Sequence, residues 1–188
     1  MILAIAGTYC SGKDIGAEYL AERFGLLEVS TGDMVRAVAK ELHGNIERKT
    51  LINTANNLRA ERGGGVLAKL ALEEYEDKQS EFNGVVISGI RSIGETQEIL
   101  RNGGHLIYVD ASLEDRWQRS RKRLREGEEQ NLDQFKKNEQ RELHGDGDDE
   151  TVINLLAVKD LADRQIDNKD NLGQYFANLE QYVQTISS

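Results

Sequence analysis

The sequence contains no proline, one cysteine and no long hydrophobic run. Because proline is absent, no X–Pro isomerisation can slow folding. The single cysteine, Cys10, excludes an internal disulfide, which suits a reducing cytosol. No apolar stretch approaches a membrane span, and the N-terminus lacks the basic flank and small-residue cleavage site of a signal peptide. We therefore expect a cytoplasmic protein with no membrane partner.

Net positive charge is also missing, since the formal net charge is −9. A nucleic-acid backbone requires a basic face on its partner, so we expect no nucleic acid to bind. A length of 188 residues, with 38% hydrophobic and 30% charged residues, is typical of one globular domain. We expect residues 1–188 to form a single domain, either as a monomer or as a small homo-oligomer.

A glycine-rich segment follows an apolar run at the very start of the chain. The run Met1–Ala6 is typical of a buried parallel strand, and Gly7-Thr8-Tyr9-Cys10-Ser11-Gly12-Lys13 follows it directly. Apolar residues then recur at helical spacing through Phe24. The order strand, glycine turn, helix is the context in which the pattern Gly-x-x-x-x-Gly-Lys indicates a phosphate-binding loop.

The residue types of this loop suit a nucleoside triphosphate. Gly7 and Gly12 allow backbone angles that aim successive N–H groups at a phosphate. Lys13 adds a mobile positive charge for the β- and γ-oxygens, and the helix N-terminus adds its partial charge. We predict that ATP binds here, and the expected contacts are Gly7, Thr8, Cys10, Ser11, Gly12, Lys13, Asp14 and Ile15.

Short apolar segments alternate with amphipathic helices along the rest of the chain. The expected strands after residues 1–6 are residues 26–30, 84–88, 106–110 and 164–166. This alternation predicts a three-layer α/β/α P-loop NTPase fold with a five-stranded parallel sheet, whose ligands bind at the carboxyl ends of the strands. Polar helical stretches at about 45–76 and 113–145 are expected to be insertions that bind an acceptor and form a lid.

The second strand leads into Ser30-Thr31-Gly32-Asp33-Met34-Val35-Arg36. Thr31 is the expected N-cap of the following helix, and Arg36 lies one turn further on. The segment resembles the acceptor-binding segment of adenylate kinases and related nucleoside monophosphate kinases. The resemblance implies that Thr31 and Arg36 hold the acceptor nucleotide, with Arg36 on its phosphate.

The third strand leads into Gly89-Ile90-Arg91, which looks like the Gly-Phe-Pro-Arg segment of the same kinases without its proline. Arg91 would then be a second clamp on the acceptor phosphate, since a guanidinium suits bidentate contact. The family often carries an aspartate before this glycine to help hold Mg²⁺, whereas this chain has Ser88.

Two further departures from the family lie just after the loop lysine. Asp14 stands where many phosphate-binding loops have Ser or Thr, and Ile15 stands where a Thr often binds the α-phosphate. A carboxylate oxygen is a ligand that Mg²⁺ prefers, so Asp14 is the predicted metal contact. The alternative is that Asp14 repels the triphosphate.

Arginines are dense in the expected lid helix. Arg119 and Arg123 are four residues apart and therefore share a face, and Arg116 and Arg125 flank them. The spacing matches the lid arginines of the family, which implies that Arg119 and Arg123 close over the transferred phosphoryl group. A solvated helix face that pairs with nearby acidic residues is the structural alternative.

The segment Ala162-Asp163-Arg164-Gln165-Ile166-Asp167-Asn168, with Gln140-Arg141, resembles dephospho-coenzyme A kinases instead. The predicted function is transfer of the γ-phosphoryl group of ATP, with Mg²⁺, to a small nucleotide-like acceptor, preferably a nucleoside or deoxynucleoside monophosphate. If the acceptor is dephospho-coenzyme A, its hydroxyl requires a base, and Asp33 is the candidate. A nucleotide-binding switch or assembly factor with little turnover is the alternative from another class.

Overall fold

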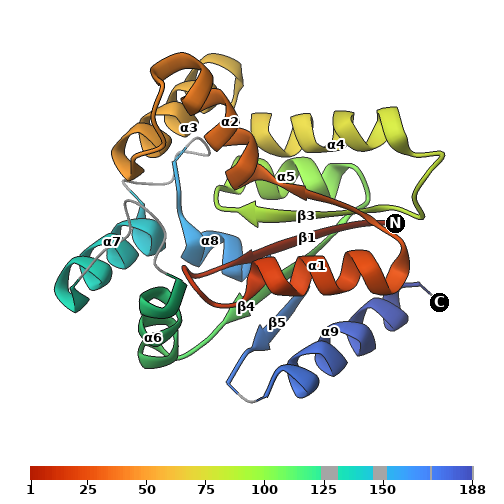
Figure 1. Cartoon of the computed structure of the whole chain (residues 1–188). Helices are drawn as coiled ribbons and strands as arrows, with labels where there is room; N and C mark the ends of the chain where they lie inside the picture. Colours follow the sequence, from red (N-terminus) through yellow and green to blue (C-terminus); the bar gives the residue numbers. More distant parts are fainter. Residues whose placement is uncertain (124–130, 146–151, 170, 188) are drawn as a thin grey trace.

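A computed structural model describes residues 1–123, 131–145, 152–169 and 171–187 of the chain. These residues form strands and helices that alternate in chain order (Figure 1). The strands are β1 (Ile2–Gly7), β2 (Leu27–Ser30), β3 (Val85–Ile90), β4 (His105–Asp110) and β5 (Arg164–Asp167). The helices are α1 (Lys13–Phe24), α2 (Thr31–His43), α3 (Arg48–Arg62), α4 (Val66–Lys78), α5 (Ile93–Arg101), α6 (Leu113–Arg123), α7 (Leu132–His144), α8 (Leu155–Asp160) and α9 (Leu172–Ile186).

The five strands form one parallel sheet in the order β2-β3-β1-β4-β5. The central strand β1 pairs with β3 on one side and β4 on the other, with Leu3 opposite both Val86 and His105. Its residues from Leu3 onward are fully buried because helices cover both faces, which explains the unbroken apolar run in the sequence. The predicted five-stranded parallel sheet is confirmed.

Helices cover the two faces of the sheet, as Figure 1 shows. Successive β1 side chains point to opposite faces, so Leu3 and Ile5 pack with α1 and α9 while Ala4 and Ala6 pack with α4, α5 and α8. The result is a three-layer α/β/α arrangement with one apolar core on each side of the sheet, as predicted.

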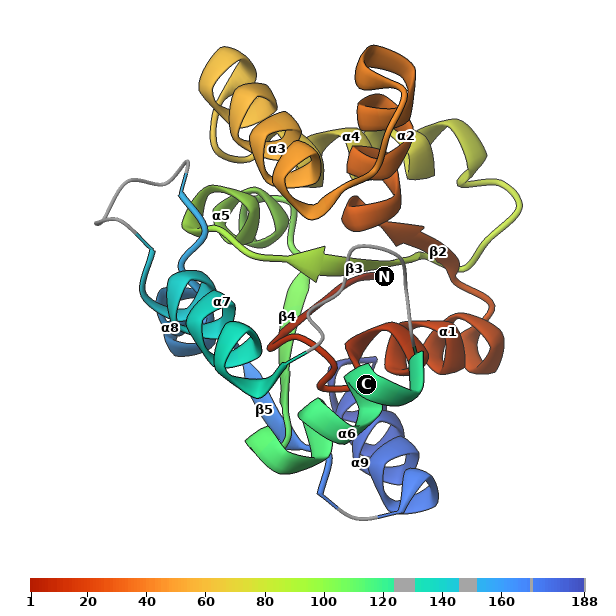
Figure 2. The same cartoon turned by 60° about the vertical axis from the view of Figure 1, so that its left-hand side comes forward.

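The carboxyl ends of β1 and β3 point to the side of the molecule where α2, α3, α6 and α7 lie (Figure 2). Helices α3 and α4 come from the segment expected at 45–76, and the break between them falls at Gly63-Gly64-Gly65. Helices α6 and α7 come from the segment expected at 113–145. Functional groups at the carboxyl ends of these strands therefore lie on the same side of the molecule as α2, α3, α6 and α7.

The structure differs from the sequence-based expectation in one element. Helix α8 was not predicted, since six residues are too few to show a helical period. Arg125 lies outside the described residues. Among the described helices, none is both long enough and apolar enough to cross a membrane.

Candidate active site

The phosphate-binding loop joins β1 to α1 and depends on two glycines. Gly7 has a φ of 154°, and a Cβ built on it would lie 2.1 Å from the carbonyl oxygen of Val109. Gly12 has a φ of 102°, and its Cβ would lie 2.3 Å from Nδ2 of Asn168. Both positions therefore require glycine, for backbone angle and for space. Cys10 also has a positive φ, at 61°, which is uncommon for a non-glycine residue.

Two side chains from the C-terminal segment donate hydrogen bonds to backbone carbonyl groups of the loop. Nδ2 of Asn168 donates to the carbonyl oxygen of Ser11 at 2.8 Å, and the Tyr175 hydroxyl donates to the carbonyl oxygen of Gly12 at 3.0 Å. Burial raises the pKa of Tyr175, so its hydroxyl remains a donor at neutral pH. These contacts tie the Ser11 and Gly12 carbonyl groups of the loop to the residue that follows β5 and to α9.

Asp110, at the end of β4, anchors the other side of the loop. The hydroxyl of Thr8 donates to Oδ1 of Asp110 at 2.8 Å, and Nζ of Lys159 lies 3.5 Å from its Oδ2. The sequence analysis did not single out Asp110. Its place at the carboxyl end of a strand next to β1 was the signal available, because parallel strands end at the same edge of a sheet.

Arg119 and Arg123 lie on α6, and they have different surroundings. Nη1 of Arg119 lies 3.4 Å from the carbonyl oxygen of Cys10 and 3.1 Å from that of Ser11, and Nη2 donates to the carbonyl oxygen of Asn168 at 2.9 Å. Arg119 therefore fastens α6 to the phosphate-binding loop. Arg123 instead borders the cavity described below. Its role and that of Arg119 in phosphoryl transfer stay predictions.

Lys13 and Asp14 form an ion pair at the start of α1. Nζ of Lys13 lies 3.2 Å from Oδ1 of Asp14, and Nη1 of Arg123 lies 3.9 Å from Oδ2. Lys13 lowers the pKa of Asp14 from 3.8, against the opposing effect of burial. The carboxylate is thus ionised at neutral pH, and its contribution to stability is present above about pH 4 and lost at lower pH.

The same carboxylate fits the chemistry of a magnesium ligand. The Asp14 side chain is 51% exposed and borders the cavity, so its hard oxygens are accessible. No cluster of three or more His, Cys, Asp or Glu side chains occurs among the described residues. Ile15 is 39% exposed and does not border the cavity.

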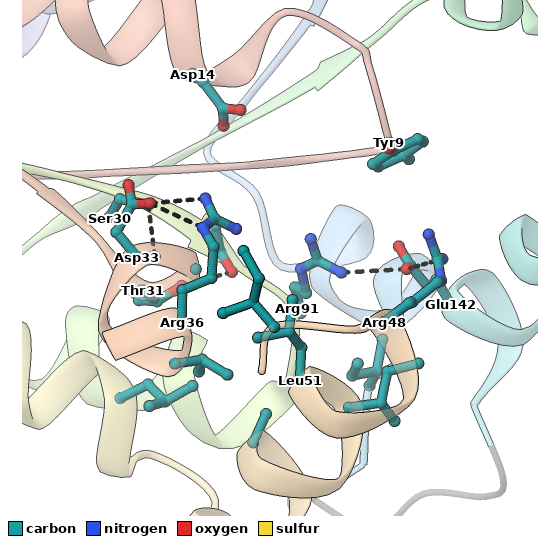
Figure 3. A pocket seen from close by; sticks show the side chains of 18 of the residues that line it. Tyr9, Asp14, Ser30, Thr31, Asp33, Arg36, Arg48, Leu51, Arg91 and Glu142 are labelled. Carbon is teal, nitrogen blue, oxygen red and sulfur yellow. Dashed lines mark hydrogen bonds and ion pairs between the residues drawn. The ribbon is translucent and has the colours of Figure 1, made fainter. Parts of the chain in front are cut away.

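A cavity of about 430 Å³ opens beside the loop (Figure 3). Its volume lies within the usual range for small-molecule sites. One set of lining residues is cationic and consists of Lys13, Arg36, Arg48, Arg59, Arg91 and Arg123. A second set is apolar and consists of Val35, Ile46, Leu51, Ile52, Ala55, Leu67 and Ile153. The cavity therefore suits a molecule with an anionic group and an apolar body.

The predicted capping role of Thr31 is wrong. Ser30 is the N-cap of α2, with its Oγ accepting from the backbone N–H of Asp33 at 3.2 Å. The buried Thr31 hydroxyl instead lies 3.2 Å from the carbonyl oxygen of Ser88 and 3.0 Å from that of Gly89. Thr31 cannot cap because it already has helical geometry, so its hydroxyl bonds the neighbouring strand. Thr31 still borders the cavity, and its predicted contact with the acceptor stays a prediction.

Asp33 and Arg36 pair with each other at the edge of the cavity. Nη2 and Nε of Arg36 lie 2.7 and 3.0 Å from Oδ1 of Asp33 (Figure 3). The pair fixes the guanidinium one helical turn from the start of α2. The Asp33 carboxylate, the predicted base, is thus also the residue that positions Arg36.

A carboxylate from α7 joins two arginines across the cavity. Oε1 of Glu142 lies 2.9 Å from Nη2 of Arg48 and 3.2 Å from Nη1 of Arg91 (Figure 3). Glu142 is 12% exposed, and its charge raises the pKa of Arg91. An anionic group of the protein thus already pairs with Arg91, one of the two predicted acceptor clamps.

Tyr9 of the loop contacts residues of α3, α6 and α7. Nη2 of Arg123 lies 3.0 Å from the Tyr9 hydroxyl, and the guanidinium groups of Arg48 and Arg123 lie 5.5 and 5.1 Å from its ring centroid. The ring also contacts Phe135, which is buried and packs against Trp117. Phe135 is 2% exposed and is therefore a core residue.

Sequence reasoning missed several residues of the cavity, among them Arg48, Arg59 and Glu142. These residues lie on α3 and α7, outside any recognisable motif. The one available signal was the spacing of α3, where Arg48, Leu51, Ile52, Ala55 and Arg59 fall on one helical face. Arg141 is exposed on α7 and does not border the cavity.

Comparisons with solved structures bear on the fold. The chain superposes on TT1252 from Thermus thermophilus with a TM-score of 0.64 at 18% identity, covering 100% of this chain and 98% of that one. It superposes on shikimate kinase from Acinetobacter baumannii, solved in complex with shikimate, with a TM-score of 0.55 at 15% identity, covering 98% and 92%. The three-layer fold is therefore that of P-loop NTPases, with kinases among the similar structures. Membership of the nucleoside monophosphate kinases in particular stays a prediction.

Comparisons of sequence bear on the family. The chain is 30% identical to a UPF0200 protein of Methanocaldococcus jannaschii over 97% of this chain and 94% of that protein. It is 29% identical to a UPF0200/UPF0201 protein of Archaeoglobus fulgidus over 97% of this chain, but spans only 54% of that protein. A family model described as an AAA domain matches residues 3–145. The chain therefore belongs to the AAA domain family and to the UPF0200 proteins.

Proposed function

We propose that the chain is a phosphotransferase that moves the γ-phosphoryl group of ATP, with Mg²⁺, to a nucleoside or deoxynucleoside monophosphate. The observation that carries the proposal is the cavity itself. It joins Lys13 and Asp14 of the phosphate-binding loop to Arg36 and Arg91, the two predicted acceptor clamps, in one continuous space. A donor phosphate on the loop and an acceptor phosphate on the arginines would therefore meet within it.

The chain's own residues would act mainly by position and charge. The loop N–H groups and Lys13 would hold the β- and γ-phosphates, and Arg123 would stabilise charge on the transferred group. Asp14 would hold Mg²⁺, which supplies neutralisation of phosphate charge. An oxygen of the acceptor phosphate attacks the γ-phosphorus while the bond to the β-phosphate oxygen breaks, so ADP leaves. Such an acceptor is already anionic, and no residue needs to act as a strong base.

The experiment that tests the proposal is phosphoryl transfer from ATP with Mg²⁺ across a panel of ribo- and deoxynucleoside monophosphates and dephospho-coenzyme A. Turnover of one or more monophosphates, with none in Lys13→Ala, supports it. Exclusive turnover of dephospho-coenzyme A would favour the alternative in which Asp33 serves as a base. ATP binding with no transfer to any acceptor would contradict the kinase proposal and favour a nucleotide switch.

Asp14→Ser is expected to raise the Mg²⁺ concentration for half-maximal activity by about tenfold, because the charged ligand becomes a neutral one. The measurement is a Mg²⁺ titration at fixed ATP, with Glu18→Gln, an exposed residue one turn along α1, as control. Tighter ATP binding with an unchanged Mg²⁺ requirement would mean that Asp14 repels the triphosphate instead.

Glu142→Gln is expected to lower the KM for the acceptor by about threefold to tenfold, because the acceptor phosphate no longer competes with a carboxylate for Arg48 and Arg91. The KM for ATP should change little. Steady-state kinetics against both substrates provides the test, and Glu114→Gln, exposed on α6, is the matched control. An increase in acceptor KM would show that Glu142 supports the arginines rather than competing for them.

A further inference from the structure

The cations that line the cavity are held in different ways. Arg59 is buried and pairs with the buried carboxylate of Glu95, with its Nη2 2.8 Å from Oε1. Arg48 and Arg123 instead lie over the ring of Tyr9, with their guanidinium carbon atoms 5.5 and 5.1 Å from its centroid. The face of an aromatic ring attracts a cation within about 6 Å, so one ring stabilises both of these charges.

Tyr9 belongs to the phosphate-binding loop, between its two glycines Gly7 and Gly12. The side chain is partly buried and borders the cavity (Figure 3). Its ring centroid lies 5.7 Å from that of Phe135, a core residue of α7. This contact limits how far the ring can move, so the loop presents it at a defined place to α3 and α6.

The hydroxyl of Tyr9 adds a contact with Arg123. Nη2 of Arg123 donates to this hydroxyl at 3.0 Å, and Nη1 lies 3.9 Å from Oδ2 of Asp14. Asp14 in turn pairs with Lys13. The guanidinium of Arg123 is thereby held beside the two residues that are expected to meet the γ-phosphate and its Mg²⁺.

Arg48 lies where an anion can bind. Its Nη2 and Nη1 of Arg91 lie 2.9 and 3.2 Å from the same oxygen of Glu142, so one anionic oxygen can contact both guanidinium groups. Arg91 is a predicted acceptor clamp, and an acceptor phosphate that replaced this carboxylate would meet Arg48 as well. The Tyr9 ring therefore holds a cation of the acceptor side, while its hydroxyl contacts a cation of the donor side.

We propose that Tyr9 is a positioning residue that orients Arg123 toward the γ-phosphate of the donor and Arg48 toward the phosphate of the acceptor. This inference rests on the proposed function and adds a residue to its site. The ring and the hydroxyl have separable parts in it. The hydroxyl acts on Arg123, whereas the ring acts on both guanidinium groups.

The test is calorimetry on the full chain with a non-hydrolysable ATP analogue and Mg²⁺, with ADP and Mg²⁺, and with GMP, AMP, UMP and CMP alone. Tyr9→Phe removes only the hydroxyl. It is expected to reduce the preference for the analogue over ADP by about fivefold and to change the Kd of the tightest-binding monophosphate by less than about twofold. Tyr9→Leu also removes the ring and is expected to raise that Kd by about fivefold.

Tyr19→Phe is the matched control. The Tyr19 hydroxyl donates to Glu180 at 2.6 Å, and Tyr19 does not border the cavity, so neither quantity should change. Circular dichroism and an unchanged ADP affinity report that a variant is folded, and Tyr9→Met replaces Tyr9→Leu if the leucine variant is not.

Equal losses for every ligand in Tyr9→Phe and Tyr9→Leu would indicate a merely structural role and overturn the inference. Folded variants that bind all ligands like the parent chain would overturn it too, and phosphoryl transfer by the parent would then leave the kinase proposal standing. The expected difference between the two variants, without transfer to any acceptor, would support the inference and contradict the kinase proposal.

Discussion

Lys13→Ala is expected to reduce the rate of phosphoryl transfer by about a thousandfold. Lys13 is buried where the phosphate-binding loop meets α1, and it lines the cavity. Its charge would act on the β- and γ-phosphate oxygens as negative charge shifts from the transferred group to ADP. Removing one such preorganised donor typically costs two to three powers of ten in rate.

Single-turnover kinetics with ATP and the best acceptor of the panel measures this effect. Lys69→Ala is the matched control, because Lys69 is exposed on α4, where it pairs with Glu73. Since Lys13 also pairs with Asp14, a small change in the free energy of unfolding is expected, and circular dichroism should show intact secondary structure. A rate within tenfold of that of the parent chain would mean that neither Lys13 nor the loop takes part in phosphoryl transfer.

The sheet and the loop could be predicted because their signals are local. An apolar run that is buried on both faces has to be continuous, and Gly7 and Gly12 are required by backbone geometry that only glycine meets without strain. The N-cap of α2 shows where a local signal is ambiguous. Ser30 and Thr31 are adjacent hydroxyl residues, and the pairing of β2 with β3 decides which of them starts the helix.

The wall of the cavity could not be predicted because it depends on contacts between distant segments. Arg59 and Glu95 are far apart in the chain, and each alone has the appearance of an exposed charge on an amphipathic helix. The same holds for Glu142, whose partners come from α3 and from the end of β3. Charge pairing of this kind is fixed by how helices pack, which one sequence does not reveal.

Glu95→Ala is expected to lower the free energy of unfolding by about 3–5 kcal/mol, because it leaves the Arg59 guanidinium charged, buried and without its partner. The substitution also removes the capping box that Glu95 forms with Ser92 at the start of α5. Urea denaturation followed by circular dichroism measures the change.

Two variants separate the buried charge from the loss of a side chain as such. Glu98→Ala, on the same helix but partly exposed, should change the free energy of unfolding by less than about 1 kcal/mol. Arg59→Met/Glu95→Gln removes both charges and keeps an acceptor for the backbone N–H groups, so it should be more stable than Glu95→Ala. If the double variant were instead as unstable as the single one, packing and capping rather than an uncompensated charge would account for the loss.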